Sequence, residues 1–228
     1  MVVVALAALL LPALSGCSTT SRLADDEVLY TGVKHITYNA PEGEEIISSV
    51  KDQVFSTINV KPNNSLYSPY IRHPFPVGLW VYNHWDNTAT KGFKHWIYEK
   101  LVAEPVLISD VRPALRVEMI KSTLENNGYF GSSATYELQY DKRNPKKARV
   151  NYTINLTTPR KLGRVMLTGG SSPVEQYIDS HARRSRYLRV GSRYCTDSLD
   201  ALRINITNRL RNRGYYFFRP EYIEYLAD

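Results

Sequence analysis

Polar and apolar residues alternate along two neighbouring segments near the middle of the chain. The small, apolar or aromatic positions are 134, 136, 138 and 140 in Ala134 to Asp141, and 148, 150, 152, 154 and 156 in the next run. A period of two residues is typical of a strand that buries one face. Because the polar sequence KRNPKK between the runs favours a turn, the pattern predicts a β-hairpin.

Leucine and isoleucine at helical spacing precede the hairpin and recur near the C-terminus. One helix is predicted over Leu115 to Leu124 and another over Leu199 to Leu210, and each is followed by a glycine that favours a helix end. The two endings read LENNGYF from Leu124 and LRNRGYY from Leu210. This repetition predicts two copies of one structural unit.

Each copy is expected to begin with a strand and a helix, and the last helix is expected to run into a further strand. In the first copy these elements are a strand over Val28 to Tyr38 and a helix over about Glu42 to Phe55. The second copy has a strand over Leu162 to Thr168, a helix that Ser172 caps and Pro173 opens, and a strand over Tyr215 to Leu226.

The predicted fold class is therefore α+β, with tandem β-α-α-β-β modules. Residues 28–158 form the first module, with an insertion at about 58–104 between its two helices. The insertion holds the aromatic-rich sequence HPFPVGLWVYNHW and a short helix near Gly92 to Leu101. Residues 159–228 form the second module, which lacks its last strand.

The N-terminal segment has the features of a lipoprotein signal. Residues 2–14 are free of charge and too short to span a bilayer as a helix, and the sequence LSGC comes directly after them. Small residues before Cys17 favour cleavage, and the thiol is the group that receives a lipid. We therefore expect residues 1–16 to be a signal peptide, Cys17 to be lipidated, and residues 17–27 to form a solvated tether containing Asp25, Asp26 and Glu27.

Four features follow one another along the chain: the lipobox LSGC, the sequence VLYTGVKHITY, the inserted FPVGLWVYN segment, and two units with GYF or GYY after the second helix. Their order resembles that of the N-terminal region of TamL-type lipoproteins. These proteins belong to the BamA/TamA outer-membrane assembly family, and the units resemble its POTRA (polypeptide-transport-associated) domains. The resemblance covers nearly all of the chain after the signal peptide. It implies an outer-membrane, lipid-anchored arm in the periplasm that passes outer-membrane protein clients to a C-terminal β-barrel or a partner barrel.

A client site is expected at the edges of a three-stranded sheet, whose unpaired backbone groups can bind an extended segment of any sequence. In POTRA domains the strand after the second helix tends to lie at an edge. By that resemblance, the client-binding positions here are Ala134, Tyr136, Leu138 and Tyr140, with Tyr222 to Leu226 as the corresponding strand of the second unit. Burial of these edges by neighbouring segments is the alternative.

Composition and charge leave two further surfaces to explain. The chain is 43% apolar and 22% charged, as globular proteins are, with a net charge of +7 and Cys195 as the single cysteine besides Cys17. A basic face at Arg183, Arg184, Arg186 and Arg189 suits a partner protein, anionic lipid headgroups or plain solvation. We expect no nucleic-acid partner, since an exported lipoprotein does not routinely meet one. In the insertion, Trp80, Tyr82 and Trp85 either cap the first sheet or form a docking patch.

The sequence contains no recognisable catalytic constellation. The five histidines have no metal-ligand spacing, and TGGSSP at 168–173 lacks the lysine of a phosphate-binding loop. We therefore expect no metal, no cofactor and no enzymatic activity. The alternatives to an assembly arm are a stand-alone outer-membrane lipoprotein that scaffolds an envelope complex, and a basic ligand-binding lipoprotein.

Overall fold

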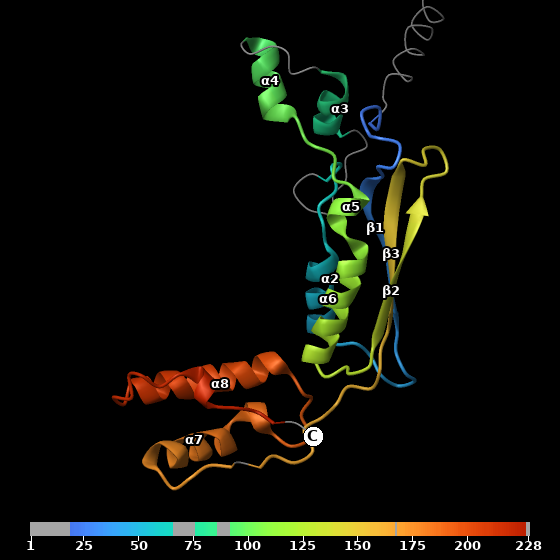
Figure 1. Ribbon diagram of the computed structural model, residues 1–228. Helices are drawn as coiled ribbons and strands as arrows, with labels where there is room; N and C mark the ends of the chain where they lie inside the picture. Colours follow the sequence, from blue (N-terminus) through green and yellow to red (C-terminus); the bar gives the residue numbers. More distant parts are fainter. Residues whose placement is uncertain (1–18, 66–75, 86–91, 167, 227–228) are drawn as a thin grey trace, which may run out of the picture. The chain divides into compact units, whose positions relative to one another are not determined.

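The computed structural model describes residues 19–65, 76–85, 92–166 and 168–226 (Figure 1). The described chain divides into two compact units. The first comprises residues 19–38, 55–119 and 134–154, and the second comprises residues 39–54, 120–133 and 155–226. The boundary thus passes through two helices, α2 (Ser48–Ile58) and α6 (Pro113–Asn126).

The first unit is built on a three-stranded sheet with the order β1-β3-β2. Its strands are β1 (Leu29–Asn39), β2 (Ser133–Tyr140) and β3 (Lys147–Asn155), so the predicted hairpin and opening strand are confirmed. The central strand β3 follows the predicted alternation, because Ala148, Val150, Tyr152 and Ile154 are buried between exposed or half-buried residues. These side chains form the sheet's contribution to the core.

Helical segments of the first unit lie on one face of this sheet (Figure 1). They are the end of α2, the short helix α5 (Ile108–Val111) and the start of α6. Arg116 on α6 joins them, because its guanidinium donates to the carbonyl oxygen of Val111 at 2.8 Å and to that of Thr57. Hydrogen bonds from Arg116 to the ends of α2 and α5 therefore hold these helices together beside the apolar core.

The predicted insertion contains two helices, α3 (Val77–His84) and α4 (Phe93–Leu101). Helix α4 confirms the short helix predicted near residues 92–101. Leu79 on α3 is buried with Leu23 and Leu29, and the partly buried Tyr82 packs against this cluster. The insertion thus has an apolar contact with the segment that precedes β1.

The second unit contains the two helices predicted for the second copy, α7 (Pro173–Arg184) and α8 (Thr196–Arg211). Ser172 caps α7 as predicted, since its hydroxyl accepts from the Glu175 N–H at 3.3 Å and its own N–H donates to the Glu175 carboxylate at 3.0 Å. Leu202, Ile206 and Leu210 on α8 form a buried cluster with partly buried residues of α7 and of the last segment.

Two predicted strands of the second copy are wrong. Among the described residues of 162–168 there is no strand; instead residues 160–162 hydrogen-bond to 191–194 through short antiparallel contacts, including the Lys161–Arg193 bridge. Tyr215 to Leu226 also forms no strand, and contains the 3₁₀ turn η2 (Pro220–Tyr222). A strand needs a neighbour to pair with, and Pro220 has no N–H to offer a ladder.

The start of the first helix is also corrected. Helix α2 begins at Ser48 rather than near Glu42. Gly43 has a φ of 81° and the Glu44 N–H bonds to the Pro41 carbonyl oxygen at 3.0 Å, so the chain turns here before the helix begins. The α+β class is confirmed, and so is the order of strand, helix, insertion, helix and hairpin predicted for the first copy.

Candidate functional site

The strand β2 lies at an edge of the sheet, since its only neighbour in the strand order is β3. The four positions predicted to bind clients all fall on this strand. Ala134 is buried and Leu138 is half-buried, whereas Tyr136 and Tyr140 are 42% and 51% exposed. The face predicted to be buried is therefore covered only in part, and the two tyrosine side chains on it are about half exposed.

The hydrogen bonds of the hairpin indicate which backbone groups of β2 face outward. The Asp141 N–H donates to the carbonyl oxygen of Lys147 at 2.9 Å, so it faces β3. Backbone groups along a strand alternate in direction, so the N–H groups of Gln139, Glu137 and Thr135 also face β3. Those of Ala134, Tyr136, Leu138 and Tyr140 then face the free edge.

The opposite edge of the sheet is covered at its N-terminal end. The Tyr30 N–H donates to the Val106 carbonyl oxygen at 2.8 Å, and the Ile108 N–H donates to the Val28 carbonyl oxygen at 2.9 Å. Residues 106–108 therefore occupy the edge of β1 where a partner strand would start. The two edges therefore differ, because residues 106–108 cover the start of β1, whereas no described strand pairs with the outer side of β2.

The residues of β2 lack the usual protection of an edge strand. Natural edges are often shielded by lysine, proline or very short strands. Ser133–Tyr140 has eight residues, contains neither lysine nor proline, and carries one charge, Glu137. This composition permits another strand to pair along its whole length.

The electrostatics beside this edge are simple. Burial raises the pKa of the Tyr152 phenol on β3 far above its usual value, so this ring stays neutral. At the hairpin turn, the backbone N–H groups of Arg143 and Asn144 bond to the Asp141 carboxylate at 2.8 and 3.1 Å and lower the pKa of that carboxyl. The turn is thus fixed by a carboxylate, which helps to hold β2 in register.

The three aromatic residues predicted to cap the sheet or to form a docking patch contact neighbouring side chains. Trp80 stacks on His84 with ring centroids 5.1 Å apart and meets Trp85 edge-on at 6.3 Å. Tyr82 packs against the Leu23–Leu29–Leu79 cluster. Their role as a docking patch stays a prediction, while the more exposed aromatic side chains of the insertion are Phe93 and Trp96 on α4.

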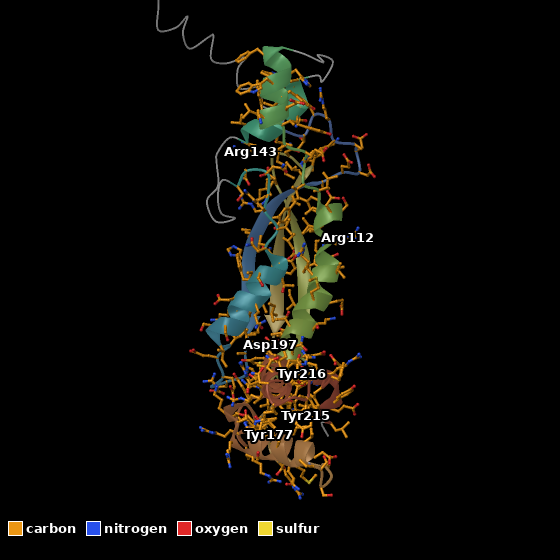
Figure 2. All side chains as sticks on the ribbon, turned by 90° about the vertical axis from the view of Figure 1, so that its left-hand side faces the viewer. Arg112, Arg143, Tyr177, Asp197, Tyr215 and Tyr216 are labelled. Atoms are coloured by element: carbon orange, nitrogen blue, oxygen red, sulfur yellow. The ribbon has the colours of Figure 1, made fainter. Side chains whose placement is uncertain are left out.

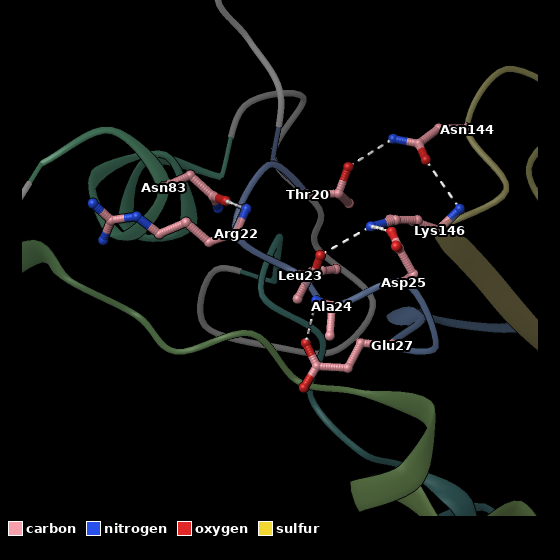
Figure 3. A network of polar contacts seen from close by, with 9 residues as sticks. All are labelled: Thr20, Arg22, Leu23, Ala24, Asp25, Glu27, Asn83, Asn144 and Lys146. Carbon is pink, nitrogen blue, oxygen red and sulfur yellow. Dashed lines mark hydrogen bonds and ion pairs between the residues drawn. The ribbon is translucent and has the colours of Figure 1, made fainter.

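Hydrogen bonds tie the segment before β1 to the rest of the first unit (Figure 3), although the Asp25 and Asp26 side chains are exposed. The side-chain amide of Asn83 on α3 donates to the Thr19 carbonyl oxygen at 3.2 Å and accepts from the Arg22 N–H at 3.1 Å. From the β2–β3 turn, Lys146 donates to the Leu23 carbonyl oxygen at 2.9 Å and pairs with Asp25 at 3.0 Å. From Thr19 to Asp25 the predicted tether is therefore held by hydrogen bonds, and Cys17 lies outside the described residues.

The four arginines of the predicted basic face have different surroundings. Arg183 pairs with Asp179 at 2.8 Å, and Arg189 lies on the exposed loop after the 3₁₀ turn η1 (Arg186–Leu188). Arg184 and Arg186 line a pocket between α7, η1 and α8, together with Arg209 and His181. Sequence reasoning missed Arg209, because it lies on another helix and its contribution depends on how α8 packs against α7.

Within the described ranges, no group of three or more histidine, cysteine, aspartate or glutamate side chains could hold a metal ion. In the same ranges, no helix combines the length and the apolar character needed to cross a bilayer. Cys195 is a free, half-buried thiol at the start of α8. The candidate sites are therefore a backbone edge and a basic pocket.

No protein-family model matches the chain, and no curated protein does. Among solved structures, the chain is similar to the crystal structure of Haemophilus influenzae BamA POTRA3-5, with 13% sequence identity and a TM-score of 0.36. The similarity covers 85% of this chain and 59% of that one, so this chain spans less than two thirds of its length. A similarity of this extent carries no conclusion about function, which must come from the residues.

Proposed function

We propose that this chain is a lipid-anchored, non-enzymatic arm of an outer-membrane protein assembly factor. Its clients are outer-membrane proteins, whose β-strands pair with the free edge of β2. The anchor is an acylated Cys17, the modules lie in the periplasm, and a C-terminal or partner barrel receives the client. The observation that carries the proposal is an eight-residue edge strand without lysine or proline.

The chemistry of the edge fits this class of client. Strands of outer-membrane barrels have about 9–11 residues with alternating side chains, so β2 has nearly enough outward backbone groups to pair with one of them. Backbone pairing needs no particular client sequence, which suits an assembly factor with many clients. Tyr136 and Tyr140 would lie across from alternate client side chains, and each such pair adds about 0.2–1 kcal/mol.

A photoreactive side chain at Gln139 tests the site. Gln139 is exposed on β2, and Glu125, exposed on α6, provides a control position away from the edge. We expect an unfolded outer-membrane β-barrel protein to crosslink to position 139 and not to position 125. The same photoreactive group is also placed at Trp80 and at Trp85. If the client crosslinks to these positions and not to 139, the insertion is the docking site and the edge mechanism is wrong.

Proline substitutions separate backbone pairing from side-chain contact. Tyr136→Pro removes an N–H that faces the free edge, whereas Tyr136→Ala removes only the ring. We expect Tyr136→Pro to abolish the crosslink at 139 with the fold retained by circular dichroism, and Tyr136→Ala to keep most of it. Glu137→Pro removes an N–H that faces β3, so it should unfold the sheet. Equal client binding by Tyr136→Pro and the unchanged chain would exclude edge pairing.

The anchor is tested separately. Mass spectrometry of the N-terminal peptide should find a lipid on Cys17, and Cys17→Ala should release the chain from membranes. A free thiol on Cys17 or an uncleaved leader would contradict the anchoring part of the proposal and leave the client edge untouched.

A further inference from the structure

The pocket in the second unit is lined by three arginines and a histidine. Its volume is about 290 Å³, and it lies between α7, η1 and α8. The lining residues are His181, Arg184, Ser185, Arg186, Tyr187, Leu202, Asn205, Ile206 and Arg209. No carboxylate is among them, so the pocket has a strong positive charge.

The contact partners of Arg186 and Arg209 are neutral, so these contacts do not compensate the charge of either guanidinium. Arg209 donates from Nε to the Asn205 amide oxygen at 2.9 Å, and Arg186 lies over the Tyr187 ring at 5.2 Å. The nearby carboxylates are used elsewhere. Asp179 pairs with Arg183, and Asp200 pairs with Arg203 at 3.6 Å. An anion from outside the chain would be the counter-charge that fits.

The number and geometry of the donors select the type of anion. A single guanidinium matches one carboxylate, whereas three arginines that line one pocket suit an anion with three or more oxygens. The floor of the pocket is apolar, since Leu202 and Ile206 are buried. We propose that this pocket binds the phosphate group of a small phosphate ester, with the carbon part of the ester against Leu202 and Ile206.

The volume limits the size of this ligand. Pockets for small molecules begin near 300 Å³, so a pocket of about 290 Å³ holds a phosphate with a substituent of a few carbon atoms. A phosphoglycerol unit has this size and chemistry, either as a free ester or as the headgroup of a lipid. The site is independent of the β2 edge, and it gives part of the basic face a specific ligand class.

Binding of glycerol 3-phosphate by the chain with Cys17→Ala, which cannot be lipidated, tests the site by titration calorimetry in 150 mM salt, and the variants are made in the same background. We expect glycerol 3-phosphate to bind at least about tenfold more tightly than acetate, because only the phosphate can engage several arginines. The test variant is Arg184→Gln with Arg209→Gln. The matched control is Arg189→Gln with Arg219→Gln, which removes the same charge from two exposed arginines outside the pocket.

The pocket variant should lose at least about tenfold in affinity and the control variant less than about twofold. Thermal unfolding followed by circular dichroism checks that both variants keep the helices. Equal losses of affinity in the two variants would mean that the overall positive charge attracts glycerol 3-phosphate and that the pocket is not a specific site. Equal affinity for acetate and glycerol 3-phosphate, or no binding up to about 10 mM, would also overturn the inference.

Vesicles distinguish the two sources of the phosphate. Phosphatidylglycerol vesicles that compete with glycerol 3-phosphate, and that bind the control variant but not the pocket variant, identify a lipid headgroup. Binding of the soluble ester without competition from vesicles identifies a free ester. Both outcomes support the pocket, and neither depends on lipidation of Cys17 or on client binding at β2.

Discussion

The two copies of the helix ending have the same local hydrogen bonds. After α6, the Tyr129 N–H bonds to the Leu124 carbonyl oxygen at 2.9 Å, and after α8 the Tyr215 N–H bonds to that of Leu210 at 3.1 Å. In both copies the glycine has a positive φ, 87° at Gly128 and 98° at Gly214. Such a cap depends on a few neighbouring residues, so the repeated sequence is sufficient to form it twice.

The two copies diverge immediately after the glycine. Tyr129 is only 2% exposed and the chain continues into β2, whereas Tyr215 is 42% exposed and no strand comes after it in the described chain. Tyr215 and Tyr216 are labelled in Figure 2. In the first copy the glycine also has a backbone partner outside the helix ending. The Gly128 carbonyl oxygen accepts from the Arg160 N–H at 2.8 Å, and the Arg160 carbonyl oxygen in turn accepts from the Tyr194 N–H at 2.9 Å. A helix end is thus encoded locally, but a strand forms only where a neighbouring strand can pair with it.

Hydrogen exchange gives the largest expected contrast. In the first copy the amides of β3 lie in the centre of the sheet. In residues 215–226 the described backbone bonds are turn bonds, such as Phe218 to Tyr215 and Ile223 to Pro220. We expect β3 amides to be at least about a thousandfold better protected than those of 215–226. Equal protection would mean that the last segment forms a strand in solution.

The paired tyrosines test packing after the glycine. Tyr129→Ala should lower the free energy of unfolding by about 3–5 kcal/mol, as removal of a buried aromatic ring does. Tyr215→Ala should cost less than about 1 kcal/mol, because that ring is half in solvent. Urea unfolding followed by circular dichroism measures both. Similar costs would contradict the difference in burial on which the comparison rests.

The paired glycines test the backbone itself. A methyl group on Gly128 would lie 2.9 Å from the Tyr194 carbonyl oxygen and 3.2 Å from that of Arg160, whereas one on Gly214 meets nothing within 4 Å. Both alanines adopt a left-handed conformation, at a cost of about 1–2 kcal/mol. We therefore expect Gly128→Ala to cost about 2–4 kcal/mol and Gly214→Ala about 1 kcal/mol. An equal loss of stability at both positions would mean that the left-handed φ causes it, and that the close carbonyl oxygens at Gly128 add nothing.

The sequence predicts the elements whose signals are local. Alternation at residues 148–156, the Ser172 cap and the two glycine stops all depend on residues within one turn or one strand. The strand predicted over 215–226 was expected by analogy with the first copy, and it is wrong because a repeated helix ending does not supply the neighbouring strand that pairing needs.

The candidate sites were predictable to a lesser extent. The four positions on β2 were predicted from a family resemblance, and their outward N–H groups agree with the hairpin bonds. The pocket combines Arg184 on α7 with Arg209 on α8, and no spacing in the sequence indicates that these two residues line one pocket. The docking of Thr19 by Asn83 joins residues 64 positions apart, and likewise has no sequence signal. Contacts that depend on tertiary packing are the part that sequence patterns leave open.

The hairpin turn gives the smallest expected effect, and it belongs to the first copy. The Asp141 carboxylate, bonded by the N–H groups of Arg143 and Asn144, has a lowered pKa in the folded chain. Its contribution to stability is therefore fully present above the unfolded pKa and is lost as the pH falls through the lowered folded value.

Since Asp141 is exposed, we expect the protection of the Asn144 amide, relative to its intrinsic exchange rate at the same pH, to fall at acid pH, with little change in overall unfolding. An NMR titration of that amide measures the effect, and Asp141→Asn, which keeps an acceptor but cannot ionise, should remove the pH dependence. If exchange of amides in residues 215–226 follows the same titration, the turn is not the feature that distinguishes the copies, because that segment has no bond to Asp141 among the described contacts.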